Sequence, residues 1–254
     1  MNAYNTEFYD LQIPRSTRSA ERVVPLVESA YKFSSVVDLG CGSGAWLSVF
    51  HKRGVDDILG LDGDHVPRAA LRIPQELFRP TDLSRPFVVD RTFDLAVSLE
   101  VAEHLPESAA DRFVDSLTTL APVVLFSAAI PFQGGTHHVN EQWPSYWAAK
   151  FARRGFVPVD FLRDNIWDDE SVEWWYTQNV LMYVRESTIH DYPDLERLRA
   201  RIPSPALDRV HPRLYLRTQT ALQSQGSAAR ILEAARFRAR NFKRFLSGRL
   251  RKTN

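Results

Sequence analysis

The stretch from Val36 to Trp46, which reads VVDLGCGSGAW, decides the fold of this chain. A short β-branched run ends in an acid and breaks into three alternating glycines, after which a new apolar-periodic segment begins at Ala45. A backbone that turns so sharply, and lets a ligand lie against it, leaves no room for Cβ atoms. The stretch therefore predicts a strand, a tight turn and the start of a helix.

Acidic and apolar segments farther along the chain decide what the turn binds. A second apolar run, Asp57 to Leu61, ends in Asp62, followed by Gly63. A carboxylate placed there can accept hydrogen bonds from both hydroxyls of a ribose. By itself, the spacing of the glycines also fits the dinucleotide-binding fingerprint. Two later segments, PTDL at 80–83 and SLEVAEHL at 98–105, have no place in that fingerprint.

Taken together, the four segments resemble, in order and spacing, the motifs of class I S-adenosylmethionine-dependent methyltransferases. The resemblance covers about residues 36–185. It implies S-adenosylmethionine as the cofactor, with PTDL at the adenine-binding position and SLEVAEHL as the segment after the fourth strand. The cofactor-binding residues that it implies are Asp38, Gly40, Cys41, Gly42, Trp46, Asp62, Gly63, Asp82, Leu83, Glu100 and Val101.

Strand and helix patterns alternate along the chain, which is typical of an α/β fold with a parallel sheet. We expect strands near residues 36–39, 57–61, 76–79, 93–99, 123–130, 156–162 and 173–185, and helices near 20–31, 45–53, 106–120 and 144–154. The resemblance implies a Rossmann-like, seven-stranded, mostly parallel sheet with an antiparallel last strand and helices on both faces. We expect the last two strands to be joined without a helix, across a polar turn at 164–171.

The chain divides by pattern into an N-terminal arm and helix at 1–34, a methyltransferase domain at 35–186 and a helical C-terminal extension at 187–254. The extension ends in a basic amphipathic pattern over about 227–250. Residues 229–254 carry nine basic side chains and one acidic one, although the whole chain has a net charge of only +1. Such a helix fits contact with an anionic membrane surface, and it equally fits packing on the body or on a second subunit in a homodimer.

Composition sets further limits. The chain has 254 residues, 44% hydrophobic and 25% charged, which is ordinary for a globular protein. Cys41 is the only cysteine, so no intrachain disulfide can form. Residues 1–10 are polar, and no apolar run reaches spanning length. We expect a cytoplasmic protein without a signal peptide, with peripheral contact at the inner membrane face as an open alternative.

The loop after the fifth strand carries the residues expected to act on the acceptor. The carboxyl ends of parallel strands share one crevice, which brings this loop beside the cofactor. His138 is the candidate general base, oriented by Glu141 or Glu100. His104 is a rival, although its position in the motif points to binding first. The alternative for His138 is that it caps the loop or bonds a backbone carbonyl.

Aromatic and polar residues in the second half of the chain are candidates for holding the acceptor. They are His137, Asn140, Trp143 and Trp167. Core packing explains a single tryptophan equally well. His138 and Glu141 have the spacing of half a metal site, and some sugar methyltransferases use magnesium. No cluster of acids completes that site in the sequence, so we assign no metal ligands and keep magnesium as the less favoured alternative.

Residues 134–146 and 173–179 resemble bacterial methyltransferases of polysaccharide assembly, including enzymes that methylate mannose-containing glycans. This second resemblance implies an O-methyltransferase acting on a sugar hydroxyl of a glycan or glycoconjugate. The alternatives are an RNA methyltransferase that uses the basic tail, a natural-product O-methyltransferase and a non-catalytic binding protein. Nucleic acid is the weaker choice, because the body is acidic and the chain lacks the Asn/Asp-Pro-Pro-aromatic signature of base methylation.

Overall fold

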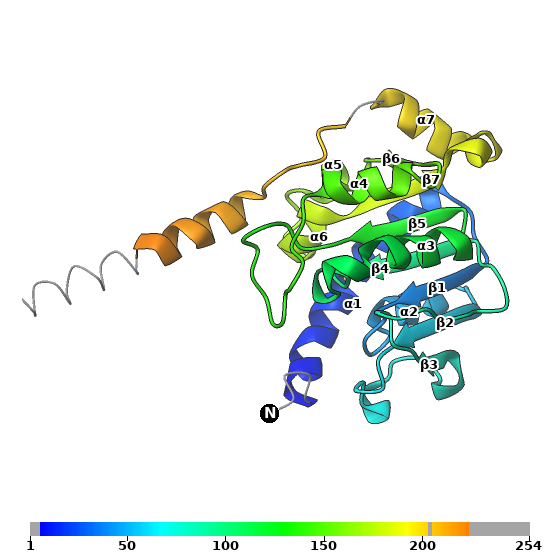
Figure 1. Cartoon of the computed structure of the whole chain (residues 1–254), viewed down its shortest axis with the longest axis horizontal. Helices are drawn as coiled ribbons and strands as arrows, with labels where there is room; N and C mark the ends of the chain where they lie inside the picture. The colour runs from blue at the N-terminus through cyan, green and yellow to red at the C-terminus, as the bar shows by residue number, and fades with distance from the viewer. Residues whose placement is uncertain (1–5, 203–204, 224–254) are drawn as a thin grey trace, which may run out of the picture. The chain divides into compact units, whose positions relative to one another are not determined.

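The computed structural model describes residues 6–202 and 205–223. A seven-stranded sheet runs through it in the order β3-β2-β1-β4-β5-β7-β6 (Figure 1). The strands are β1 (Ser35–Leu39), β2 (Asp57–Asp62), β3 (Phe78–Pro80), β4 (Leu95–Leu99), β5 (Val123–Ser127), β6 (Phe156–Val159) and β7 (Leu181–Arg185). β1 to β5 pair in parallel, whereas β7 runs antiparallel to both β5 and β6. The predicted fold class is confirmed.

Within residues 6–202 the structure has seven α-helices and five short 3-10 helices. The α-helices are α1 (Thr6–Ala30), α2 (Ala45–Lys52), α3 (Ala110–Leu120), α4 (Pro144–Ala152), α5 (Leu162–Ile166), α6 (Trp174–Asn179) and α7 (Pro193–Arg201). The 3-10 helices are η1 (Arg68–Ala70), η2 (Gln75–Leu77), η3 (Ala102–His104), η4 (Glu107–Ala109) and η5 (Glu186–Asp191). A further helical segment spans 212–223.

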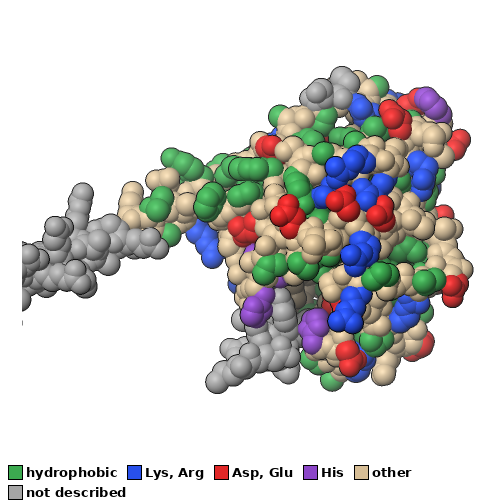
Figure 2. Space-filling model, viewed as in Figure 1, with side chains coloured by type: hydrophobic (Ala, Val, Ile, Leu, Met, Phe, Trp, Pro, Cys, Tyr) green, Lys and Arg blue, Asp and Glu red, His purple; other side chains and the backbone are tan. Residues whose placement is uncertain are grey.

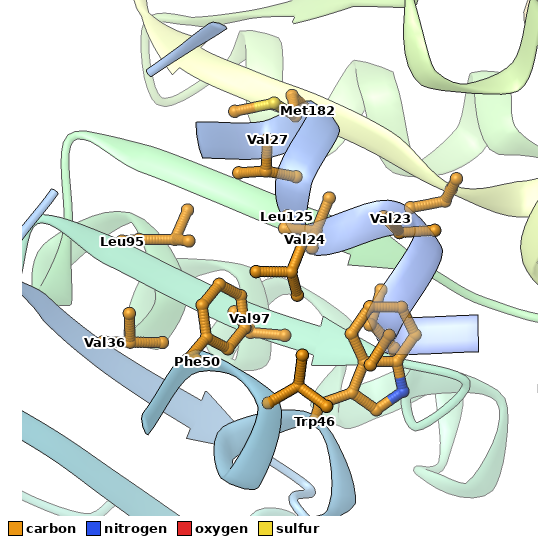
Figure 3. Packing of buried hydrophobic residues seen from close by; sticks show 14 of the residues in the cluster. Val23, Val24, Val27, Val36, Trp46, Phe50, Leu95, Val97, Leu125 and Met182 are labelled. Carbon is orange, nitrogen blue, oxygen red and sulfur yellow. The ribbon is translucent and has the colours of Figure 1, made fainter. Parts of the chain in front are cut away.

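The sheet is buried on both faces, which explains the continuous apolar runs of β4 and β5. Alternate side chains along each strand point to opposite faces. On one face, Val23, Val24 and Val27 of α1 pack with the α2 side chains over the sheet (Figure 3). On the other face, α3 and α4 pack on the complementary set of strand residues. Each face thus has its own apolar layer, and the strand ends remain free to carry polar groups.

Two expected elements differ from the structure. The N-terminal helix begins at Thr6, although Pro14 and Pro25 lie inside it and the sequence pattern predicts a helix only from residue 20. Burial of its apolar face, with Val23, Val24 and Val27 fully covered, outweighs the cost of the prolines. At the other end of the domain, α5 replaces the start of the polar turn expected at 164–171.

The strand predicted over 173–185 is wrong in its first half. Residues 174–179 form α6, and β7 begins only at Leu181, so helices do lie between β6 and β7. The aromatic run at 174–176 has high strand propensity. However, four successive side chains, from Tyr176 to Asn179, are buried, which the two-sided alternation of an amphipathic strand does not give. Tertiary contacts therefore decide the conformation here.

The chain forms two compact units, residues 1–211 and 212–254. Within the first unit, the segment before His211 is held by Arg163, whose fully buried guanidinium donates to the carbonyl oxygens of Ala206 and Leu207. The basic helix expected over 227–250 lies outside the described residues. Within the described residues, no helix has the length and apolar character needed to cross a membrane.

Candidate functional site

The glycine turn between β1 and α2 has the backbone that its sequence predicts. Gly40, Gly42 and Gly44 have φ values of 87°, 54° and 78°, which L side chains rarely adopt. A Cβ on Gly40 would lie 2.3 Å from Cγ2 of Val101, which follows β4. The turn is therefore closed against the β4 loop, and this close approach requires glycine at position 40.

Asp62 joins the end of β2 to this turn. Its Oδ2 accepts a hydrogen bond from the backbone N–H of Gly42 at 2.6 Å, and its Oδ1 accepts one from Gly63 at 2.6 Å. Burial raises the pKa of this carboxyl, and the two N–H donors oppose the rise. Each carboxylate oxygen still has a lone pair, so Asp62 can also accept hydrogen bonds from a ligand.

A small pocket of about 40 Å³ opens beside the turn. Its lining includes Asp38, the turn from Gly40 to Ser43, Trp46 of α2 and Tyr176 of α6. Gln12, Ile13 and Ser16 of α1 close another side, so the N-terminal helix borders the pocket. Burial, and next the charge of Asp62, raise the pKa of Asp38 well above its ordinary value. An Asp38 carboxylate would therefore be favoured by a positively charged ligand group.

The residues expected to bind a cofactor do not all lie in one place. Asp38, Gly40, Cys41, Gly42 and Trp46 line the pocket. Asp62 and Val101 contact the turn from outside the pocket lining, and Gly63 donates to the Asp62 carboxylate.

Asp82 and Leu83 follow β3, beyond the pocket lining. The exposed Asp82 accepts hydrogen bonds from Ser84 and pairs with Arg85. The segment is tied to β2 because the N–H of Thr81 donates to the Asp62 carbonyl oxygen at 2.7 Å.

Glu100 lies at the end of β4 in a buried amide network. Its two carboxyl oxygens accept from Nε2 of Gln133, at 2.8 Å, and Nδ2 of Asn179, at 3.1 Å. Gln178 also donates to Gln133 and to Asn179. Burial raises the pKa of Glu100 to about 7, against the hydrogen bonds from Asn179, Ser127 and Gln133. Glu100 thus joins the β4 end, the loop after β5 and α6.

The loop after β5 is anchored on η3. The N–H groups of Val139 and Asn140 donate to the carbonyl oxygen of Glu103 at 2.9 and 3.0 Å. These bonds bring the ring of His138 edge-on to the ring of His104, with centroids 4.8 Å apart. The structure therefore places together the two histidines that the sequence separates by 34 positions.

Glu141 holds this loop together. Its Oε1 lies 2.9 Å from Nδ1 of His138 and accepts from the N–H of Gly134, while its Oε2 accepts from the N–H of Phe132. Of the two predicted orienting residues, Glu141 is the one that contacts His138. With Nδ1 engaged, Nε2 is the nitrogen of His138 left for a substrate or ion.

The partly buried His104 has a lowered pKa. Burial, then the neighbouring His138, lower the pKa of His104 to about 4, although a backbone hydrogen bond with His137 opposes the shift. Glu103, beside it, is fully buried, and neither of its carboxyl oxygens has a hydrogen-bond partner in the described part of the chain. Unpartnered buried carboxyl groups are rare in native proteins and indicate a missing partner.

The four residues expected to hold an acceptor have different surroundings. His137 is exposed with a φ of 59°, and Trp143 is 37% exposed at the start of α4. Asn140 is 4% exposed, and its Nδ2 has no partner among the described residues. Trp167 packs against His211, with ring centroids 4.9 Å apart, so its known contacts are within the fold.

Sequence reasoning did not select several residues that the structure brings to the site. Glu103 stands in the quoted SLEVAEHL segment, and its acid beside a histidine was an available signal. Tyr176, Gln133 and Asn179 gave no such signal, because their placement depends on α6 and on the loop meeting across the sheet.

Comparison with known proteins gives a family match and distant structural neighbours. A sequence model described as a methyltransferase domain matches residues 12–177. Curated protein sequences give no match. The amino pentose methyltransferase CalS10 of Micromonospora echinaspora superposes with a TM-score of 0.53 at 16% identity, over 73% of this chain and 99% of that chain.

Two further solved structures are similar over a smaller part of their own length. DesVI of Streptomyces venezuelae gives a TM-score of 0.43 at 24% identity, over 50% of this chain and 57% of that one. The small RNA methyltransferase HEN1 gives 0.49 at 19% identity, over 66% of this chain and 25% of that one. The match thus spans less than two thirds of both proteins.

Proposed function

The chain belongs to the methyltransferase-domain family and uses S-adenosylmethionine, and from that premise we propose that it methylates a sugar hydroxyl. The observation that carries the proposal is the pair formed by His104 and His138, with Glu141 on Nδ1 of His138. A pair of this kind suits an acceptor whose proton must be removed, as a hydroxyl requires.

The residues around the pocket fit S-adenosylmethionine. No described residue donates a hydrogen bond to the 3%-exposed Asp38, which can therefore face the charged end of the cofactor. Asp62 retains lone pairs for a ribose, and Gly40, Gly42 and Gly44 have no Cβ that would hold a ligand away from the backbone of the turn. When bound, the cofactor supplies a methyl group on a positively charged sulfur, which an acceptor oxygen displaces in line.

The protein then has to position the acceptor and take its proton. We propose that His138, in the absence of a metal ion, accepts the proton of the acceptor hydroxyl. Glu141 fixes Nδ1 of His138, which leaves Nε2 to accept that proton. His104 stays neutral beside it, since its pKa is about 4. It therefore adds no positive charge that would oppose protonation of His138.

Exposed aromatic groups support a sugar as the carrier of that hydroxyl. Phe132 is 85% exposed and Trp143 is 37% exposed, and both belong to the loop that holds His138. Flat faces beside polar groups are a common way to bind a ring with an apolar face and polar edges. The fold also serves an amino pentose acceptor in CalS10.

The charge of the described surface supports a glycan over nucleic acid. Figure 2 shows basic and acidic side chains interspersed over the face with α3 and α4. There, Asp111 pairs with Lys150, Arg153 and Arg154. A surface that follows a phosphate backbone instead presents basic side chains without such partners.

Transfer of labelled methyl tests the proposal. The purified protein is incubated with methyl-labelled S-adenosylmethionine and with separate pools of bacterial glycans, RNA and small phenolic or polyketide alcohols. We expect label in the glycan pool, in a linkage that resists base and is recovered as an O-methyl sugar after acid hydrolysis. Label confined to RNA, or to the small alcohols, would overturn the sugar assignment.

A further inference from the structure

We propose that Glu103, His104 and His138 bind a divalent transition-metal ion, Mn²⁺ or Zn²⁺, where η3 meets the loop after β5. Their ligand atoms, one from each side chain, all lie within 4.8 Å of one another. Two of the residues come from η3 and the third from the loop that hydrogen-bonds to the Glu103 carbonyl. The backbone thus holds the three side chains together.

Glu103 provides the independent sign of a missing cation. The residue is fully buried, and both carboxyl oxygens lack a hydrogen-bond partner in the described part of the chain. Taking a carboxyl group out of water without a hydrogen-bond partner is costly. A bound cation would supply the partner.

Both imidazoles are oriented in the way that metal-binding histidines are. A ligating histidine almost always gives its other ring nitrogen to a carboxylate or a backbone carbonyl. Nδ1 of His138 is 2.9 Å from Glu141, and His104 has a backbone hydrogen bond with His137. One nitrogen of each ring is thereby fixed by the protein, and the other is available to an ion.

The ligand types select the ion. Two imidazoles and one carboxylate suit borderline ions such as Zn²⁺ and Mn²⁺, whereas Mg²⁺ prefers oxygen ligands throughout. Ligands about 2.1 Å from an ion stand roughly 3 to 4 Å apart, so the three side chains need to close by about 1 Å. Three protein ligands also leave positions open for water or substrate.

The role of the ion deepens the proposed function and rests on it. An acceptor hydroxyl that enters an open position has its pKa lowered by the cation. The O–H bond breaks, the proton passes to solvent, and the oxygen keeps the electron pair with which it bonds the methyl carbon. The sulfur takes the pair of the broken C–S bond. In this arrangement His138 is a ligand, and the ion replaces it as the group that activates the hydroxyl.

Binding of Mn²⁺ alone, without acceptor, tests the site. The full chain, stripped with chelator, is titrated with Mn²⁺ and the free ion is followed by electron paramagnetic resonance, with Zn²⁺ added as competitor. Glu103→Gln and His138→Gln each remove a ligand. Glu107→Gln is the matched control, because Glu107 is exposed and lies four positions from Glu103.

We expect the wild type and Glu107→Gln to bind one ion per chain, displaced by Zn²⁺, and to melt at a higher temperature with Mn²⁺. Both ligand variants should lose more than about 10-fold in affinity and all of the shift in melting temperature. A chain that binds no ion, or ligand variants that bind as tightly as the control, would overturn the site. The titration contains no acceptor, so ion binding is tested separately from the sugar assignment. The protein can bind the ion even if it does not methylate a sugar, and it can methylate a sugar even if it binds no ion.

Discussion

The glycine turn, where we place the cofactor, and the histidine loop, where we propose that the acceptor binds, are built in opposite ways. The glycine turn is a backbone site: three glycines have positive φ, and the N–H of Gly42 donates a hydrogen bond to Asp62. The proposed acceptor site rests on side chains from distant segments: His104 meets His138, and Glu100 meets Asn179, 79 positions away. A backbone site fixes one ligand for a whole family, whereas a side-chain site can change its substrate through a few replacements.

The first prediction concerns a substitution at Gly40, where the glycine turn lies closest to Val101. Gly40→Ala forces a Cβ into Val101 at a φ of 87°. We expect S-adenosylmethionine binding to be lost and the free energy of unfolding to fall by about 3 kcal/mol or more, since strain and overpacking add. Calorimetry and denaturant unfolding measure the two effects.

Gly54→Ala is the matched control for that substitution. Gly54 also has a positive φ, of 96°, but a Cβ there would meet nothing within 4 Å. Strain alone should cost about 1 kcal/mol and leave cofactor affinity unchanged. Equal losses in the two variants would show that φ, and not the contact with Val101, limits position 40.

The second prediction concerns the polar network that joins the two regions. Burial raises the pKa of Glu100 from 4.5 to about 7 in the folded protein. The folded state therefore binds the proton more tightly than the unfolded state, and stability is lost as the pH rises from about 4.5 to 7. At about 1.4 kcal/mol per pKa unit, the loss amounts to roughly 3 kcal/mol.

Glu100→Gln should remove this contribution. Urea unfolding at pH 5 and pH 8 measures the difference in stability for wild type and variant. The variant has a constant offset from its altered amide contacts, so the change between the two pH values is the informative quantity. An equal change in both proteins would show that Glu100 titrates normally.

The same contrast decides what could be predicted from the sequence. The turn at 40–44 was predictable because local backbone rules act over a few residues. The alternation of strand and helix patterns predicted an α/β fold with a parallel sheet, and the resemblance to methyltransferases implied the seven strands and the antiparallel last strand. The helix at 174–179 could not be predicted from the sequence. Burial of Gln178 and Asn179 against distant partners overrides the strand propensity of the preceding aromatic residues. Glu103 was visible in the sequence, but its lack of a partner was not.

The third prediction removes one cofactor contact without strain. Asp62→Ala should weaken S-adenosylmethionine binding by about 2 kcal/mol, or roughly 30-fold, through the lost acceptor for the ribose and for the Gly42 N–H. Asp64→Ala, at a side chain 86% exposed, is the control. Calorimetry that finds unchanged affinity for Asp62→Ala, or tight NAD binding by the wild type, would contradict the assignment.

The fourth prediction, with the smallest expected effect, concerns Trp143, where we propose that the acceptor binds. Trp143→Ala removes an aromatic face that is 37% exposed, so the folded state loses little. We expect the KM for the glycan to rise by a factor of about 5, corresponding to about 1 kcal/mol, with cofactor affinity unchanged. An unchanged KM would place the acceptor on another part of the loop.

The central claim is that the histidine pair serves the acceptor and the glycine turn serves the cofactor. The most direct measurement is made on His138→Ala, with His190→Ala, at a side chain 77% exposed, as control. Calorimetry should find S-adenosylmethionine affinity within about twofold of the wild type, while methyl transfer to glycan falls by about 100-fold or more. Loss of cofactor binding in His138→Ala, or transfer near the wild-type rate, would contradict this division of roles between the two regions.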